Sequence, residues 1–309
     1  MKRTVYFADL THTVQGIHSP YFPLGISFVV SYAIKGLNSD FGFRLFKYPS
    51  ELEEAIKKDP PDMLCLSNYS WNKNIAYKLG SLAKLHYPQL ILVFGGPNFP
   101  IEDSEKIGFL KRYSAVDFYI ELEGELGFVD LARKLELYQF DVERLKANGE
   151  KIQNCTYLSG EQLVSGPINS IQDINIIPSP YLTGIMDPLF ELPLIPMVET
   201  TRGCPFSCTF FADGLKIKSN VRRFDINRIR EELYFIAKKI RKSDELTLTD
   251  LNFGMYTEDL QTCQIIAELR EKYNWPIMIK AAAGKNKKEI IIEAATILKG
   301  SWVVGAAIQ

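Results

Sequence analysis

The sequence lacks an excess of charge of either sign. Its 309 residues include 36 basic and 37 acidic side chains, which gives a formal net charge of −1. A balanced surface of this kind has no field that would gather nucleic acid or anionic lipid. We therefore expect a small-molecule substrate, and neither nucleic acid nor a membrane as a partner.

Long apolar runs are also missing. A membrane-spanning helix needs roughly 20 consecutive apolar residues, and no segment provides them. Residues 1–10 become polar too early for a secretory signal, so we expect a cytoplasmic protein. Hydrophobic residues make up 46% of the chain and charged residues 24%, a globular balance that allows two domains with separate cores.

Cysteine is too scarce for a disulfide framework in a chain of this length, and its number is odd. Reduced thiols or metal ligation are better interpretations. Cys263 falls on the apolar side of a predicted helix and is expected to be a core residue. The five cysteines are Cys65, Cys155, Cys204, Cys208 and Cys263.

The chain up to residue 138 alternates short β-rich runs with helical stretches, a pattern typical of βαβ units. Right-handed crossovers would arrange these units as a flavodoxin-like five-stranded parallel sheet. The predicted strands are 5–10, 43–46, 63–67, 90–94 and 118–121, and the predicted helices are 26–35, 51–58, 75–87 and 101–113.

Residues 139–194 read as a connector with a hairpin at Ser159 and Gly160, and a second alternation fills residues 195–309. It contains about four βα-type strands, too few to close a barrel. The last strand, 302–306, is apolar on both faces, so we expect a missing C-terminal segment or a partner to cover it. The predicted strands are 196–200, 245–250, 277–282 and 302–306, and the predicted helices are 227–242, 258–273 and 287–298.

The most specific motif is the loop at residues 199–211. It contains Cys204 and Cys208, and it has Phe211 where one more cysteine would complete the pattern C-x-x-x-C-x-x-C. Three thiolates on one tight loop after a strand would suit an iron–sulfur cluster with one iron left open. Phe211 offers no lone pair to iron, so we expect a cluster in this chain to be weakly held or absent.

This loop, together with the later run 246–254, resembles the cluster loop and second barrel strand of cobalamin-dependent radical S-adenosylmethionine (SAM) enzymes. The resemblance covers nearly the whole chain. It implies a cobalamin-binding domain followed by a partial radical SAM barrel, with a [4Fe–4S] cluster, SAM and cobalamin as cofactors. It also implies Cys204 and Cys208 as cluster ligands, Phe210 near the adenine, an external electron donor, and methyl transfer or rearrangement on a small molecule.

Further candidate cofactor contacts lie after the predicted strands of the second half. Asp250, Asn252 and Gly254 follow one strand and are candidates for the methionine part of the cofactor. A simple turn of Asp, Asn and Gly is an equally good interpretation. Lys280 is placed at the end of the next strand, on the lip of the same site.

In the first half, the candidates follow the third, fourth and fifth strands, where the resemblance implies that the nucleotide tail of cobalamin would run. A glycine pair after a strand lets backbone approach a bulky ligand. The loop at residues 9–16 lacks the Asp-x-His-x-x-Gly spacing of domains that place a histidine on cobalt, so we expect no protein histidine there. The candidates are Ser67, Tyr69, Gly95, Gly96, Glu123 and Gly124.

Two other functions stay open. The first is a non-catalytic cobalamin-binding module or truncated gene product, which Phe211 favours. The second is a flavodoxin-like nucleotide binder, although no glycine-rich loop follows the first strand. No residue is assigned as catalytic.

Overall fold

The computed structural model describes residues 2–14, 16–206, 219–284 and 286–305. The chain forms two compact units, the first made of Met1–Ser19 and Gly25–Ile171, and the second of Pro20–Leu24 and Gln172–Gln309. The first domain was predicted to end at residue 138. The first unit continues beyond that point because a hairpin within the predicted connector joins its sheet.

The first unit is an α/β fold built on a mostly parallel sheet of seven strands in the order β2-β1-β3-β4-β5-β6-β7. The five predicted parallel strands are present. The hairpin predicted at Ser159 is β6 and β7, and β6 pairs antiparallel to β5 through Cys155 and Ile120. The strands are β1 (Arg3–Ala8), β2 (Phe41–Phe46), β3 (Met63–Ser67), β4 (Ile91–Gly95), β5 (Phe118–Ile120), β6 (Cys155–Ser159) and β7 (Gln162–Ser165).

Helices cover both faces of this sheet, which explains why β3 is buried along its whole length. Leu64 and Leu66 pack in a core with helices α2, α3 and α4. On the opposite face, Phe128 of α5 packs edge-on against Phe7 of β1, with ring centroids 4.9 Å apart. The helices are α1 (Leu24–Gly36), α2 (Pro49–Lys58), α3 (Lys73–His86), α4 (Asp103–Arg112), α5 (Gly124–Leu137) and α6 (Val142–Ala147).

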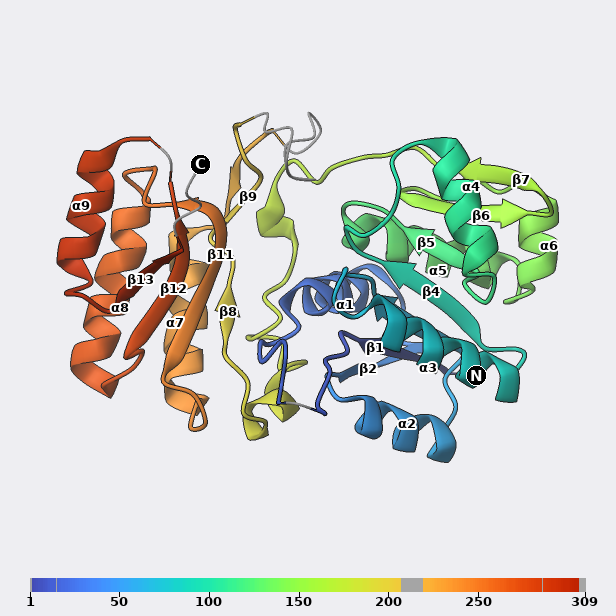
Figure 1. Cartoon of the computed structure of the whole chain (residues 1–309), viewed down its shortest axis with the longest axis horizontal. Coiled ribbons are helices and arrows are strands. Elements are labelled where there is room, and N and C mark those ends of the chain that lie inside the picture. Colours follow the sequence, from blue (N-terminus) through green and yellow to red (C-terminus); the bar gives the residue numbers. More distant parts are fainter. Residues whose placement is uncertain (1, 15, 207–218, 285, 306–309) are drawn as a thin grey trace. The chain divides into compact units, whose positions relative to one another are not determined.

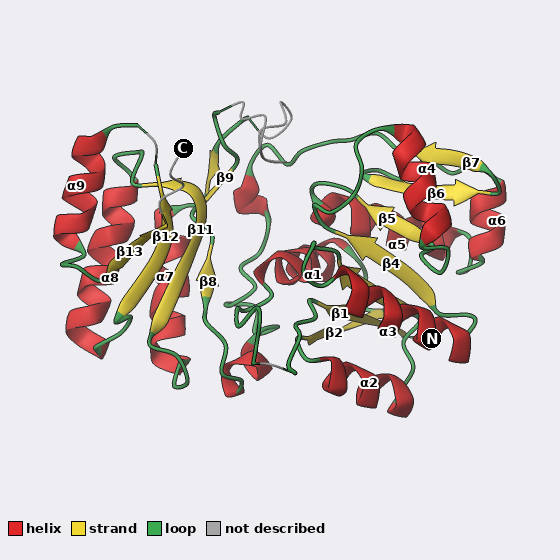
Figure 2. Cartoon of the chain, viewed as in Figure 1, coloured by secondary structure: helices red, strands yellow, loops and turns green. Residues whose placement is uncertain are grey.

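The second unit contains a four-stranded parallel sheet in the order β8-β11-β12-β13, so each later strand adds beside the one before it. Helices α7, α8 and α9 connect these strands and lie along one face of the sheet (Figure 2). These are the helices and strands that the sequence predicted. They are β8 (Met197–Val198), α7 (Ile226–Lys239), β11 (Glu245–Phe253), α8 (Asp259–Tyr273), β12 (Met278–Ala283), α9 (Lys288–Ile297) and β13 (Trp302–Gly305).

A short antiparallel ribbon of β9 (Thr201–Arg202) and β10 (Arg222–Arg223) lies beside this sheet, and β9 belongs to the motif at residues 199–211. The 3₁₀ helices η1 (Ile174–Ile176) and η2 (Asp187–Glu191) lie in the segment before β8. No helix within the described ranges combines the length and the apolar character needed to cross a membrane.

The segment at residues 20–24 leaves the first unit and packs in the second. The backbone N–H of Phe22 donates to the carbonyl of Ile195 at 3.0 Å, and the Phe22 ring packs edge-on against Phe190 with centroids 5.1 Å apart. Phe22 is buried as a result. The chain therefore enters the second unit early, returns to the first, and enters the second again after Ile171.

Candidate functional site

The predicted site residues of the first unit do come together at one edge of its sheet. Strands β3, β4 and β5 are parallel neighbours, so their carboxyl ends share an edge. The candidates end or follow these strands: Ser67 and Tyr69 at β3, Gly95 and Gly96 at β4, and Glu123 and Gly124 after β5.

Ser67 belongs to a buried polar network that fastens the loop after β1. Its hydroxyl donates to the Asp9 carboxylate at 2.6 Å, and Asn72 Nδ2 donates to the same oxygen at 3.2 Å. The other Asp9 oxygen accepts from Lys47 Nζ at 2.7 Å, and the Lys47 side chain is fully buried. The Asp9 carboxylate is thus occupied by three donors from the protein.

Tyr69 forms part of an aromatic surface next to this network. Its ring stacks on that of Trp71 with centroids 4.5 Å apart and planes 8° apart, and Trp71 is 54% exposed. His12 lies against the same loop, with Nε2 at 3.1 Å from the Trp71 carbonyl oxygen. The stacked pair therefore places a largely exposed Trp71 and a partly exposed Tyr69 next to the sheet edge.

Gly96 is needed for a close approach within the protein itself. Its φ of +126° is unfavourable for other residues, and a Cβ atom there would lie 2.9 Å from the carbonyl oxygen of Asn68. Asn68 is fully buried, and its side-chain amide donates to Tyr119 Oη at 2.9 Å and to the Asn98 carbonyl at 2.8 Å. Gly96 directly follows β4. Because it has no side chain, the loop after β3 can pack closely against it.

Gly96→Ala is expected to lower the free energy of unfolding by about 3 kcal/mol, because the side chain adds both backbone strain and a clash. Gly108→Ala is the matched control: Gly108 lies inside α4 with no atom within 4 Å of its Cβ position. That change should stabilise by about 1 kcal/mol. Urea denaturation measures both, and equal midpoints would contradict the role given to Gly96.

Glu123 and Gly124 also serve the first unit's own packing. One Glu123 carboxylate oxygen accepts the backbone N–H of Ile171 at 2.8 Å. A Cβ atom on Gly124 would lie 2.8 Å from Cγ2 of Val29 in α1, so a glycine is required where α5 begins. Both residues stand at the predicted edge, and their described contacts are structural.

In the second unit, Cys204 follows β9 and is partly exposed. Its sulfur lies 3.3 Å from Asn252 Nδ2 near the end of β11. Cys208, Phe210 and Phe211 lie outside the described residues. Among the residues that are described, no three His, Cys, Asp or Glu side chains form a metal-binding group. Cys263 is fully buried in α8, as predicted for a core residue.

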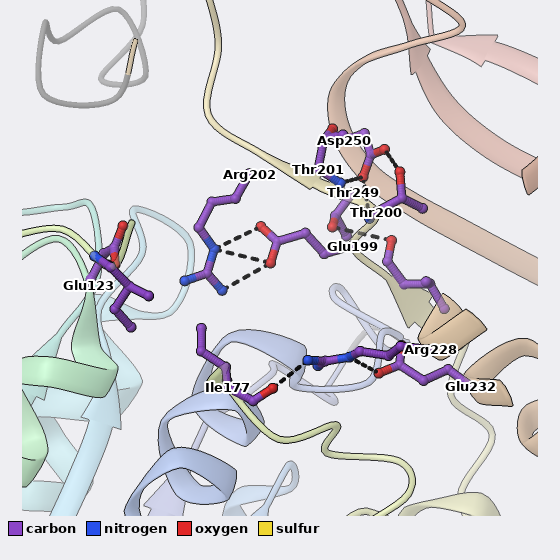
Figure 3. Close-up of polar contacts among 12 residues, drawn as sticks. Glu123, Ile177, Glu199, Thr200, Thr201, Arg202, Arg228, Glu232, Thr249 and Asp250 are labelled. Carbon is purple, nitrogen blue, oxygen red and sulfur yellow. Dashed lines mark hydrogen bonds and ion pairs between the residues drawn. The ribbon is translucent and has the colours of Figure 1, made fainter. Parts of the chain in front are cut away.

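Both carboxylate oxygens of Asp250 accept hydrogen bonds from the segment that precedes Cys204. Its carboxylate accepts the backbone N–H of Thr200 at 2.7 Å and of Thr201 at 3.1 Å, and it also accepts the Thr200 hydroxyl (Figure 3). Burial of this carboxyl raises its pKa from 3.8 to about 6. The sequence analysis proposed Asp250 as a cofactor contact. It did not identify Thr200 and Thr201 as the partners of Asp250, and their only sequence signal was their position before the Arg-Gly-Cys-Pro run.

Two further ion pairs involve arginines of the β9–β10 ribbon. Glu199 and Arg202 form a two-pronged contact, with N···O distances of 2.9 and 3.2 Å (Figure 3). Asp259, at the start of α8, accepts the guanidinium of Arg223 at 2.8 Å and the backbone N–H of Gly254 at 2.9 Å. The sequence analysis missed this anchor, for which the only signal was an acidic residue near the start of the predicted helix 258–273.

The loops after β11 and β12 touch each other. Gly254 has a φ of +78°, which favours glycine. The N–H of Gly284 donates to the carbonyl of Phe253 at 2.8 Å. Lys280 was predicted at the end of its strand, but β12 continues to Ala283, and the Lys280 ammonium lies 2.5 Å from Glu245 at the start of β11. Lys280 therefore faces away from the carboxyl edge, because three more residues of the strand remain paired.

Two curated relatives match almost the whole chain. A 2-(S-pantetheinyl)-carbapenam-3-carboxylate methyltransferase of Streptantibioticus cattleyicolor is 29% identical, and the cobalamin-dependent radical SAM methyltransferase TokK of Streptomyces tokunonensis is 28% identical. Each alignment covers 94% of this chain and 42% of the relative. The chain thus spans about two fifths of the length of these relatives. No protein-family model matches it.

Solved structures share the fold. OxsB, a cobalamin-dependent SAM radical enzyme solved with aqua-cobalamin and SAM, matches with a TM-score of 0.69 and 17% identity over 98% of this chain and 43% of its own. TsrM from Kitasatospora setae, solved with cobalamin and a [4Fe–4S] cluster, matches with a TM-score of 0.67 and 12% identity over 96% of this chain and 57% of its own. The chain is therefore a homologue of cobalamin-dependent radical SAM enzymes, and the resemblance predicted from its motif loop is confirmed.

Proposed function

We propose that the chain is a cobalamin-binding radical SAM protein of the methyltransferase type, acting on a small molecule by methyl transfer or rearrangement. The observation that carries this proposal is the position of Cys204, which follows β9 and contacts the carboxyl end of β11 through Asn252. This is the end where strands of βα barrels present ligands. The homology to TokK supports the same reading.

The first unit is proposed to bind cobalamin as a flavodoxin-like domain. Its ligand edge would be the carboxyl ends of β3, β4 and β5, with Tyr69 and Trp71 as the exposed contact surface. We further propose that no protein histidine binds cobalt, because the Asp9 carboxylate that could orient one is already occupied by Lys47 and Asn72.

The second unit is proposed to be part of a radical SAM barrel. Consecutive parallel strands with helices along one face are the arrangement of a barrel sector. When bound, the cluster would bind SAM at its open iron and supply the electron that cleaves the sulfonium. Cys204 and Cys208 would be its ligands, Phe210 would lie near the adenine, and Gly254 would lie near the methionine part.

The chain does not supply enough cysteine ligands to complete this cluster. Two thiolates, Cys204 and Cys208, stand where three are needed, and the phenyl ring of Phe211 cannot replace the third. We therefore propose that radical chemistry is impaired in the chain as written. Phe211 also favours the alternative of a non-catalytic cobalamin-binding module. The external electron donor and the cytoplasmic location stay predictions.

Cobalamin binding by the full chain is the test of the first-unit proposal. Hydroxocobalamin titrated into the protein, followed by absorbance and equilibrium dialysis, should bind with defined stoichiometry. Tyr69→Ala should weaken binding about tenfold, the effect of losing one aromatic contact. Tyr87→Ala is the control, because Tyr87 is also partly buried but precedes β4 at the opposite edge of the sheet. Equal affinities of the two variants would refute the proposed edge.

A further inference from the structure

We propose that the second unit carries a peripheral binding site for a small organic carboxylate, in a cavity between α8, α9 and the start of β12. The cavity has a volume of about 350 Å³. Small-molecule sites range from roughly 300 to 1,000 Å³, so this cavity suits a compact ligand. None of its lining residues belongs to the proposed cobalamin or SAM sites.

The cavity lies at the amino ends of parallel strands. Ile277 directly precedes β12, and Lys299 precedes β13. Arg270 in the last turn of α8 and Ile297 at the end of α9 complete this border. The end of β11 that carries Asn252 is at the opposite edge of the sheet, because β11 and β12 are parallel. A ligand in the cavity therefore leaves the carboxyl edge free.

Half of the residues that line the cavity are apolar. They are Ala267 of α8, Pro276, Ile277 and Ile297. Pro276 is buried, whereas the Ile277 side chain is 53% exposed. An apolar ligand that covers this side chain removes apolar surface from water, which favours binding. The ligand should therefore carry a small apolar body.

The charged residues that line the cavity favour an anion. Arg270 and Lys299 are two cations, and Glu271 is the one acid among the lining residues. In the part of the chain that the structure describes, the Lys299 ammonium forms no ion pair, so Glu271 does not neutralise it. The cavity thus combines apolar contacts with a surplus of positive charge, which suits an apolar molecule with one negative group.

The Arg270 guanidinium is held in place before any ligand arrives. Its Nη1 donates to the carbonyl of Leu298 at 2.6 Å, and Leu298 is fully buried at the end of α9. Among the described residues, Leu298 is the one hydrogen-bond partner of this side chain. The N–H groups on Nε and Nη2 form a planar fork that matches the two oxygens of a carboxylate. A donor fixed in this way loses little entropy on binding.

Benzoate is the test ligand, because it joins one carboxylate to a compact apolar ring. Titrated into the isotope-labelled full chain, it should shift the NMR signals of Arg270, Ile277 and Lys299. The dissociation constant should be in the millimolar range, as expected for a ligand of about nine non-hydrogen atoms. Benzamide has the same shape without the charge and should bind about tenfold more weakly. Equal affinities of benzoate and benzamide would contradict selection for a carboxylate.

Two substitutions test the cavity itself. Arg270→Gln should weaken benzoate binding about tenfold, because its amide can still donate to Leu298 but carries no charge. Ala267→Leu should weaken binding at least as much, since a larger side chain fills the cavity while leucine still favours a helix. Arg230→Gln is the matched control: Arg230 pairs with Glu268 outside the cavity. It should change the affinity by less than about twofold, because exposed charges at a distance are screened.

Thermal unfolding gives a second measurement and shows that each variant is folded. A ligand that binds only the folded state raises the midpoint, so benzoate should stabilise the unmodified chain and Arg230→Gln more than Arg270→Gln or Ala267→Leu. Equal benzoate affinities of Arg270→Gln, Ala267→Leu and the unmodified chain would overturn the inference, as would a saturating titration that leaves the signals around the cavity unmoved. Neither measurement involves cobalamin or iron, so either result leaves the proposed function standing.

Discussion

Phe211→Cys is expected to bind about four irons per chain after anaerobic reconstitution with iron and sulfide, whereas the unmodified chain should bind far fewer. The change restores the third thiolate at the spacing set by Cys204 and Cys208. Iron and sulfide analysis measures the gain, and the visible absorption of the cluster follows it. Reductive cleavage of SAM should appear in the variant and stay at background in the unmodified chain.

Phe210→Cys is the matched control for this experiment, because it adds the same thiol one residue away from the ligand spacing. It should not raise the iron content to the level of Phe211→Cys. About four irons in the unmodified chain would contradict the proposed impairment and would show that another ligand takes the place of the missing thiolate.

The second large effect is expected at Asp250. Because its pKa is raised from 3.8 to about 6 in the folded state, the unfolded state releases this proton first as pH rises. Stability from this group is fully present below pH 3.8 and is lost as pH rises through about 6. The loss amounts to about 3 kcal/mol at neutral pH.

Asp250→Asn should remove this dependence, because an amide has no proton to lose. Its oxygen can accept the N–H groups of Thr200 and Thr201, and its nitrogen can donate to the Thr200 hydroxyl. Between pH 4 and pH 8, the unfolding free energy of the Asn variant should therefore improve by about 3 kcal/mol relative to that of the unmodified protein.

Asp250→Ala supplies the opposite result at the same position. It leaves two buried backbone N–H groups without an acceptor, which should destabilise the protein by about 3 kcal/mol at neutral pH. Urea titrations at several pH values measure all three proteins. A parallel pH profile for the unmodified protein and the Asn variant would refute the assigned pKa shift.

Periodicity in the sequence was enough to predict most elements of both sheets. Strand β3 is a continuous apolar run, and the amphipathic helix α7 was found within a few residues of its ends. What periodicity could not show was pairing between distant segments. The hairpin at Ser159 was recognised as local structure, but its attachment to β5 depends on a tertiary contact between Cys155 and Ile120.

The candidate site was predictable in position and less so in role. Parallel strands carry their following loops to one edge, which is why Ser67 and Gly96 were placed together. Position 96 requires glycine because a side chain there would clash with the backbone of Asn68, and no local sequence pattern reveals this contact. Likewise, the polar character of Asp250 suggested a ligand contact, but its burial and its threonine partners appear only in three dimensions.

The early crossing of residues 20–24 limits how this molecule can be divided. No single cut yields a native first unit, because Pro20–Leu24 belongs to the second unit and is followed by α1 of the first. A recombinant piece ending at Ile171 would expose Phe22, which is 1% exposed in the whole chain. A truncation that removes the second unit therefore also removes the contacts of Phe22 with Ile195 and Phe190.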